Sequence, residues 1–338
     1  MENSTLATYV WKDADNNTRC KVKVLSKEVT SVDDLPTWNF DGSSTGQAEG
    51  KYSDVFIKPV RIYNDPFRGG KHILVLCECW DNETTPNSHN TRKELVEIQE
   101  KHASLEPLCG IEQEYVLFDR KTKLPYNWNS PHDPGMGPQG PYYCGVGGGN
   151  AFGREISDKH LDMCLKANIK VYGTNAEVMP SQWEFQIGTC DPLRTADDMT
   201  MALYILNRVT EDYGCYVNLH PKPYLGDWNG SGAHTNFSTK AMREDGGLKV
   251  IEETCKKFEP HHKECIEKYG ADNHMRLTGD HETANVNQFL WGVGHRGASI
   301  RIPKQCVIDG KGYFEDRRPA SNCDHYLVLS TILRIVAE

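Results

Sequence analysis

Two glutamates, Glu112 and Glu114, lie two residues apart in an otherwise apolar stretch over 110–118. Side chains at positions i and i+2 of a β-strand point to the same face, so these carboxylates are expected to enter one space. Two like charges repel there, and removing each from water costs on the order of several kcal/mol unless a positive group compensates. A divalent cation with oxygen ligands would supply that charge.

A second pair of acids, Glu177 and Glu184, lies among bulky apolar residues within 175–188. Any single glutamate is also a candidate partner in a surface salt bridge, which is worth little. Four carboxylates in apolar surroundings are harder to explain in that way. They predict a site that holds more than one metal ion.

The first ninety residues predict a small β-rich domain. Short candidate strands are separated by turn-forming residues, and they cover 7–12, 20–25, 54–62 and 72–80. The stretch 38–46 is rich in Gly and Ser and also aromatic, so it is expected to be an irregular loop with a function. Cys77 and Cys79 are interpreted as part of an ordinary strand rather than as ligands of a soft metal.

From residue 90 onward the pattern predicts an α+β domain with a largely antiparallel sheet. A helix over 91–102 leads into the strand of Glu112, and the Pro- and Gly-rich segment 125–150 is expected to be a long ordered loop. Three further helices are expected, one capped by Ser157, one over 195–214 and one over 247–269. The remaining candidate strands cover 169–172, 183–187, 215–219, 234–238, 298–302 and 313–317. The expected domains are 1–88 and 89–338.

Composition excludes several classes of protein. The 338 residues include 38 basic and 47 acidic side chains, a formal charge of −9, and no basic run, so nucleic acid is not an expected partner. Neither a signal peptide nor an apolar segment of membrane-spanning length is present, which predicts a cytoplasmic protein without a membrane anchor. The 12 cysteines are scattered and are expected to be free thiols.

Seven aperiodic segments together resemble one known family. They are 38–45, 65–68, 110–115, 137–147, 175–188, 234–239 and 313–319. In this order and spacing they closely resemble glutamine synthetase of the eukaryotic type, from about residue 8 to about residue 325. The resemblance implies an N-terminal β-grasp domain and a catalytic domain with a curved, mainly antiparallel sheet. It also implies a homo-oligomer of stacked rings, a decamer, with active sites between subunits.

The resemblance implies ATP-dependent ligation of ammonium to the γ-carboxylate of L-glutamate through γ-glutamyl phosphate, giving L-glutamine, ADP and phosphate. ATP is then a co-substrate, and at least two Mg²⁺ or Mn²⁺ ions serve each active site. The implied ligands of one ion are Glu114, Glu177 and Glu184, and those of the second are Glu112, His234 and Glu315. On sequence alone, His234 would more often be a hydrogen-bonded core histidine.

The remaining site residues are also assigned by the resemblance. L-glutamate is expected to contact Asn229, Gly230, Arg276, Arg296 and Arg317. ATP is expected to contact Asn236, Ser238, Arg296, Arg301 and Tyr313. The residues expected to act in catalysis are Arg296, Glu282 on a flap, and Asp41 from the adjacent subunit. Alone, Asp41 would more often form an Asx turn.

The chain departs from the family at several positions. Leu108 and Cys109 stand where relatives carry two aromatic residues, and Thr189 replaces a usual proline, so weaker stacking on adenine is expected. Asp280 replaces an aromatic residue before the flap's His-Glu pair, which is expected to alter closure of the flap.

Three rival functions stay open on the sequence. A related γ-glutamyl ligase would use the same activation with a larger amine, and intact Asp41 and Glu282 favour ammonium over that reading. A catalytically silent family member would have lost metal or phosphate ligands, and none is lost. A metal-dependent hydrolase would not need four arginines or a flap that excludes water.

Overall fold

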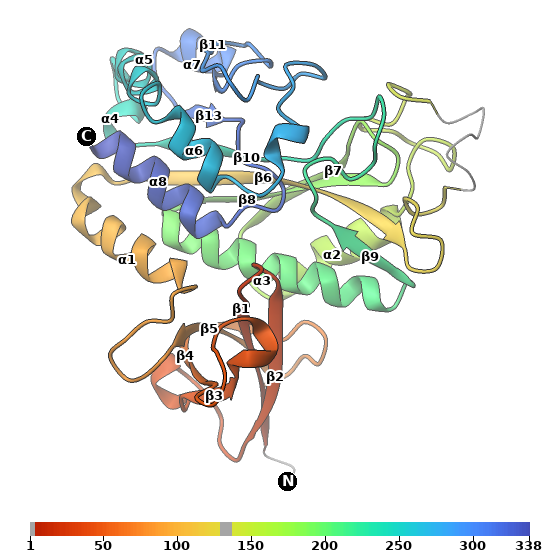
Figure 1. Cartoon of the computed structure of the whole chain (residues 1–338), viewed down its shortest axis with the longest axis vertical. Helices are drawn as coiled ribbons and strands as arrows, with labels where there is room; N and C mark the ends of the chain where they lie inside the picture. Colours follow the sequence, from red (N-terminus) through yellow and green to blue (C-terminus); the bar gives the residue numbers. More distant parts are fainter. Residues whose placement is uncertain (1–3, 129–136) are drawn as a thin grey trace.

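The computed structural model describes residues 4–128 and 137–338. Two sheets organise the chain, a five-stranded sheet in the N-terminal part and an eight-stranded sheet, covered by helices, in the remainder (Figure 1). Helices and antiparallel strands are mixed in the second part, so the predicted α+β class is confirmed. The boundary at residues 88 and 89 stays a prediction, and it falls between the last strand of the first sheet and the first helix.

The N-terminal sheet has the strand order β2-β1-β5-β4-β3. Its strands are β1 (Thr5–Lys12), β2 (Thr18–Leu25), β3 (Trp38–Asp41), β4 (Asp54–Asn64) and β5 (Ile73–Trp80). The expectation that 38–46 is irregular is wrong for its first half, because β3 pairs with β4. Phe40 is buried and packs against Trp11 with ring centroids 4.6 Å apart, which explains the extended pairing. A 3₁₀ turn, η2 (Gly42–Thr45), follows directly.

The eight-stranded sheet has the order β11-β12-β13-β10-β6-β8-β7, and β9 pairs with β6. Its strands are β6 (Leu108–Asp119), β7 (Val171–Ala176), β8 (Gln182–Cys190), β9 (Cys215–Asn218), β10 (Ala233–Ser238), β11 (Trp291–Val293), β12 (Ile300–Ile302) and β13 (Phe314–Asp316). Only β11 and β12 run parallel among these pairs. The expected irregular segment 125–150 contains no helix or strand in 125–128 and 137–150, and 129–136 lies outside the described residues.

The helices are α1 (Thr91–Lys101), α2 (Arg154–Lys166), α3 (Pro192–Glu211), α4 (Lys240–Arg243), α5 (Gly247–Lys257), α6 (His262–Lys268), α7 (Lys304–Asp309) and α8 (His325–Ala337). Three helix expectations need correction. Ser157 lies inside α2 rather than at its cap, and α3 begins after the N-cap Asp191, before the expected Thr195. The single helix expected over 247–269 is two helices, because Pro260 cannot continue the first.

The long helix α3 lies between the large sheet and the N-terminal domain (Figure 1). Its buried Asp197 accepts hydrogen bonds from Arg61 at 2.9 Å, Arg92 at 2.7 Å and the Tyr326 hydroxyl at 2.9 Å. The neighbouring Asp198 accepts one from the Tyr63 hydroxyl at 2.9 Å. These buried contacts attach the small domain to the helical face of the sheet.

Gln113 lies on the face of β6 that is covered by helices. Its side chain is fully buried, accepts a hydrogen bond from His325 Nε2 at the start of α8 (2.7 Å), and donates one to the Ser321 carbonyl (3.0 Å). Successive residues of a strand point to opposite faces. Glu112 and Glu114 therefore point to the face that these helices leave open.

All twelve cysteines are free, and ten of them are buried, which confirms the expected free thiols. In residues 4–128 and 137–338, none of the helices is both long enough and apolar enough to cross a membrane.

Candidate active site

The pairing of four strands, β6, β8, β10 and β13, gathers five of the six residues predicted to bind metal, and the sixth, Glu177, directly follows β7. In the register of β6 with β10, His234 lies opposite Glu112, and in that of β6 with β8, Glu184 lies opposite Glu114. Glu315 reaches the same face from β13, which pairs with β10. Because cross-strand neighbours lie about 5 Å apart, this register brings together residues distant in sequence.

Three carboxylates form the first cluster. Glu114, Glu177 and Glu184 are buried, and their nearest ligand oxygens lie within 4.8 Å of one another. Burial, followed by repulsion from the neighbouring carboxylates, raises the pKa of Glu177 to about 9 and that of Glu184 to about 8. Burial also raises the pKa of Glu114, although the Arg276 guanidinium and the Gly232 amide oppose this. These raised pKa values show that the clustered carboxylates lack a positive counter-charge, which a bound cation would supply.

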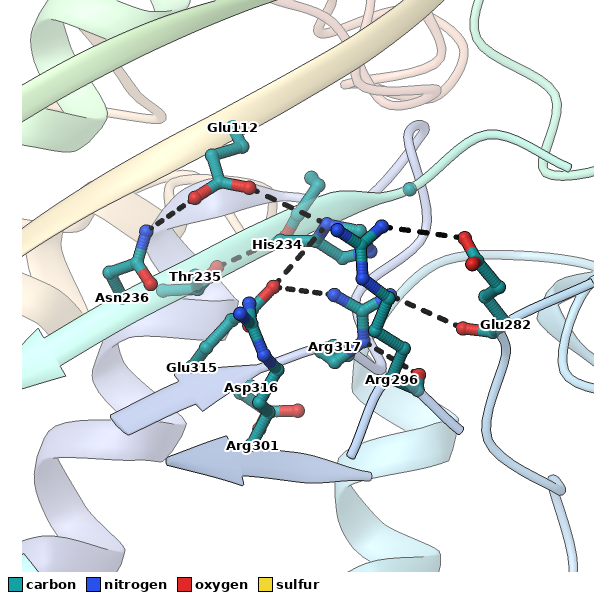
Figure 2. A network of polar contacts seen from close by, with 12 residues as sticks. Glu112, His234, Thr235, Asn236, Glu282, Arg296, Arg301, Glu315, Asp316 and Arg317 are labelled. Carbon is teal, nitrogen blue, oxygen red and sulfur yellow. Dashed lines mark hydrogen bonds and ion pairs between the residues drawn. The ribbon is translucent and has the colours of Figure 1, made fainter. Parts of the chain in front are cut away.

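The second cluster contains Glu112, His234 and Glu315, with ligand atoms again within 4.8 Å. His234 Nδ1 lies 3.7 Å from Glu112 and 3.6 Å from Glu315 (Figure 2). Burial lowers the pKa of His234 well below its ordinary value, so the imidazole is neutral and one ring nitrogen keeps its lone pair. Two carboxylates and a neutral imidazole suit Mn²⁺, and a mainly oxygen set suits Mg²⁺. The residues present therefore fit two divalent cations.

Both clusters border one cavity of about 660 Å³, which is also lined by four arginines, Arg276, Arg296, Arg301 and Arg317. Arg317 and Arg301 donate to the two oxygens of Glu315 at 2.7 and 2.8 Å (Figure 2). Arg276 is buried, and Arg296 is exposed. A cavity with paired carboxylates and fixed guanidinium groups can bind metal ions and anionic substrates together.

The loop over 226–232 closes one end of this cavity with Asn229 and Gly230. Glycine is required at Gly230, since a Cβ there would lie 2.6 Å from the Pro221 carbonyl oxygen and 2.7 Å from Arg276 Cγ. A Cβ at Gly232 would lie 2.3 Å from Arg276 Nη2. The small residues therefore let the buried guanidinium approach the loop backbone.

A second cavity of about 460 Å³ adjoins the first, and Glu112 borders both. Its walls are largely apolar, and they include Leu108, Ile187 and Phe237. Of the four residues predicted to contact ATP and not L-glutamate, three line it, namely Asn236, Ser238 and Tyr313. The fourth, Arg301, lines the first cavity. The departures Leu108, Cys109 and Thr189 line it as well.

Sequence reasoning missed Arg243, which lines the second cavity and donates to the Ser238 hydroxyl at 3.0 Å. In the sequence, the only indication of a role for Arg243 was its position as a basic residue shortly after a predicted strand. It also missed Gln139 and Tyr143, which border the first cavity from the segment that follows the undescribed residues.

Of the three residues predicted to act in catalysis, the structure places Glu282 and Arg296 in the first cavity and Asp41 outside it. Asp41 ends β3 in the N-terminal sheet. Its carboxylate accepts hydrogen bonds from the Ser43 amide at 3.0 Å and the Ser44 hydroxyl at 3.0 Å. Within one chain, Asp41 and Glu282 are therefore not neighbours.

An acidic cavity with four arginines, beside an apolar cavity, is the site of a metal-dependent enzyme that acts on anionic substrates. The family model described as "Glutamine synthetase, beta-Grasp domain" matches residues 4–82, and "Glutamine synthetase, catalytic domain" matches 88–258. The chain belongs to the glutamine synthetase family, which confirms the resemblance seen in the sequence.

Similar curated proteins named "Glutamine synthetase" come from fungi. The Kluyveromyces lactis protein is 54% identical over 331 residues, which cover 98% of this chain and 88% of the relative. The Fusarium solani subsp. phaseoli protein is 52% identical over 329 residues, 97% and 92% of the two chains. The Tuber borchii protein is 52% identical over 336 residues, 99% and 93%. These fungal relatives agree with the eukaryotic type.

Proposed function

We propose that the first cavity joins ammonia to the γ-carboxylate of L-glutamate through γ-glutamyl phosphate, with release of L-glutamine, ADP and phosphate. ATP-dependent glutamine synthesis is the function of the family to which the chain belongs. The observation that carries the assignment of this reaction to the cavity is the convergence of two acidic clusters and four arginines on it.

Two divalent cations, Mg²⁺ or Mn²⁺, are proposed to bind at the acidic clusters. Glu114, Glu177 and Glu184 would hold one, and Glu112, His234 and Glu315 the other. When bound, the ions neutralise the phosphate oxygens and align the transferring phosphoryl group. Five of the six proposed ligands come from strands, and Glu177 directly follows β7, which fixes the clusters relative to the rest of the cavity.

L-glutamate is proposed to lie between the glycine-rich loop and two arginines. Arg276 and Arg317 would pair with the α-carboxylate, and Asn229 with the backbone at Gly230 would contact the amino group. The buried guanidinium of Arg276 is fixed by the carbonyl oxygen of Arg317 at 3.0 Å. A guanidinium held in this way binds a carboxylate with little loss of side-chain freedom.

Arg296 and Arg301 are proposed to contact the phosphoryl group as it passes from ATP to the γ-carboxylate. Arg301 is anchored through Glu315 at the metal cluster, whereas Arg296 is exposed and reaches Glu282 at 3.5 Å. Arg296 would also contact the γ-carboxylate, and it would stabilise negative charge that develops in the transition state.

Ammonium is proposed to lose its proton to a carboxylate before it attacks. The amine nitrogen then forms a bond to the γ-carbonyl carbon, and the bond from that carbon to the phosphate oxygen breaks. Glu282 borders the cavity, and Asp41 would come from another copy of the chain, because the Asp41 of the same copy does not line that cavity. As the resemblance to the family implies, we propose that this copy belongs to a homo-oligomer of stacked rings, a decamer, and we propose the cytoplasm as its location.

The adenine of ATP is proposed to occupy the second cavity, with Asn236, Ser238 and Tyr313 as contacts. Leu108 supplies aliphatic surface there. Leu108→Phe is expected to tighten ATP binding about 3- to 10-fold, since an aromatic contact adds about 0.5–1.5 kcal/mol. Calorimetric titration with ATP and Mg²⁺ would measure this change, and Leu165→Phe, at an exposed position on α2, is the control. Unchanged or weaker affinity for Leu108→Phe would contradict the location of adenine.

The reaction is tested with purified protein, Mg²⁺, ATP and L-glutamate. Phosphate release is compared with ammonium, with putrescine and without an amine. We expect release to depend on ammonium and to equal the glutamine formed. Faster release with putrescine would favour a γ-glutamyl ligase for larger amines, and equal release in all three samples would contradict amide synthesis.

A further inference from the structure

We infer that Asp227 and Gln139 form a strap that holds His281 and thereby positions Glu282 over the first cavity. This inference rests on the proposed function and deepens it, because Glu282 is the proposed ammonium carboxylate. Asp227 does not border the cavity among the described residues. It is a positioning residue rather than a catalytic one.

The segment that carries Glu282 is a short projecting hairpin. Thr278 and Asn285 form an isolated bridge at its base, and the tip between them has no helix or strand. His281 and Glu282 both have left-handed backbone conformations, with φ of 51° and 62°. Non-glycine residues occupy this region at a cost, so surrounding contacts must hold the tip in this form.

Both ring nitrogens of His281, which itself borders the first cavity, have partners from other loops. Nε2 lies 2.8 Å from Asp227 Oδ1, and Nδ1 lies 3.3 Å from Gln139 Nε2. The same Gln139 amide donates to Asn229 Oδ1 at 2.7 Å. A neutral imidazole satisfies this arrangement, because it donates through Nε2 and accepts at Nδ1. The strap therefore joins the hairpin to two loops that border the cavity.

The contacts of Glu282 itself are longer than the contact between His281 and Asp227. Arg296 Nη1 reaches its carboxylate at 3.5 Å, and Arg317 Nη2 donates to its backbone carbonyl at 3.2 Å (Figure 2). Arg317 has a shorter bond to Glu315, at 2.7 Å, and Arg296 is exposed. These contacts alone hold the tip loosely. Among the described residues, the His281 to Asp227 pair is the shortest side-chain contact from the tip to another loop.

Loss of the strap has a specific chemical consequence. A tip that spends more time open removes Glu282 from the cavity and admits water. Water then competes with ammonia for γ-glutamyl phosphate, and its attack gives glutamate and phosphate without glutamine. Both effects concern the ammonium half of the reaction.

The test compares Asp227→Ala with Asp227→Asn, whose amide oxygen can still accept from His281 Nε2. The matched control is Asp245→Ala, which removes another exposed aspartate with a 2.8 Å ion pair, to Lys311, shortly before α5 begins. Initial rates are measured against ammonium and L-glutamate separately, and glutamine and phosphate are counted in the same samples.

For Asp227→Ala we expect the KM for ammonium to rise about 3- to 10-fold, as for loss of one ordinary hydrogen bond, because the Asp227 carboxylate is exposed to solvent. The KM for glutamate should change less, and more than one phosphate should be released per glutamine. Asp227→Asn should restore both values, and Asp245→Ala should behave as wild type.

Equal increases in both KM values at one phosphate per glutamine would mean a general loop defect and would overturn the inference. Wild-type behaviour of Asp227→Ala would overturn it as well, and the proposed function would then stand. If the wild-type protein itself releases phosphate without any dependence on ammonium, the proposed function fails, and the strap loses its role with it.

Discussion

Glu114→Ala is expected to lower kcat for glutamine formation on the order of 10³-fold. Glu114 is the carboxylate at the centre of the first cluster, and its oxygen Oε2 also accepts the Gly232 amide at 2.6 Å. Removal of a metal ligand from the site of phosphoryl transfer eliminates charge neutralisation that no neighbouring residue can supply. Steady-state rates and calorimetric titration with Mn²⁺ would measure the loss of activity together with the loss of one binding site.

The control for this substitution is Glu211→Ala, which removes an exposed glutamate paired with Arg208 at the end of α3. It should leave both activity and metal binding unchanged. Light scattering should show the same particle mass for both variants and the wild type. Near-normal turnover by Glu114→Ala would rule out the proposed role of the first cluster.

The metal-free protein is expected to lose stability as the pH rises. Burial and like charges raise the folded-state pKa values of Glu177 and Glu184 to about 9 and about 8, above an unfolded value of 4.5. The folded state therefore binds more protons than the unfolded state between these limits, and the free energy of unfolding falls as the pH rises from about 4.5 to about 9. Between about pH 6 and pH 8 the fall should be on the order of 2 kcal/mol, less than two independent groups would give.

Denaturant unfolding in a chelator would measure this dependence, and added Mg²⁺ or Mn²⁺ should reverse it because the cation replaces the protons. Glu177→Gln should make the metal-free protein more stable at about pH 8 and should flatten the pH profile. Glu211→Gln is the matched neutralisation at an exposed site and should do neither. A flat wild-type profile would contradict the electrostatic account of the cluster.

Of all the site residues, the acidic pairs were the easiest to predict from the sequence. Alternation along a strand depends only on local geometry, so Glu112 and Glu114 could be placed on one face without tertiary information. Glu315 was harder to predict, because its charged neighbours in the sequence suggested a surface segment. The structure separates this run by face, since Asp316 and Arg318 form a buried ion pair of 2.7 Å while Glu315 faces the cavity.

The grouping of the acids into two clusters could not come from local pattern. It depends on which strands are neighbours, and β6 pairs with β8 and β10, which lie far from it in sequence. The resemblance to a family supplied the grouping instead. The same limit applies to Asp41, whose turn is locally ordinary and whose proposed role needs a second copy of the chain.

Helix starts were wrong where two signals competed. Thr195 and Asp198 have the spacing of a capping box, but Asp191 and Pro192 form a stronger start because proline is well suited to the first helical position. Asp198 is instead used in the buried contact with Tyr63. Asp198 therefore has the spacing of a capping-box residue, although its side chain bonds Tyr63, which is distant in sequence.

Because Glu112 forms the boundary between the two cavities, recognition of the base and recognition of the phosphates become separable. With adenine in the apolar cavity, adenosine would bind whether or not divalent ions are present. Each added phosphate would reach further across the boundary toward the carboxylate clusters, so the affinity gained from AMP to ADP to ATP would depend increasingly on the ion. Inhibitors confined to the apolar side would then act independently of cellular magnesium.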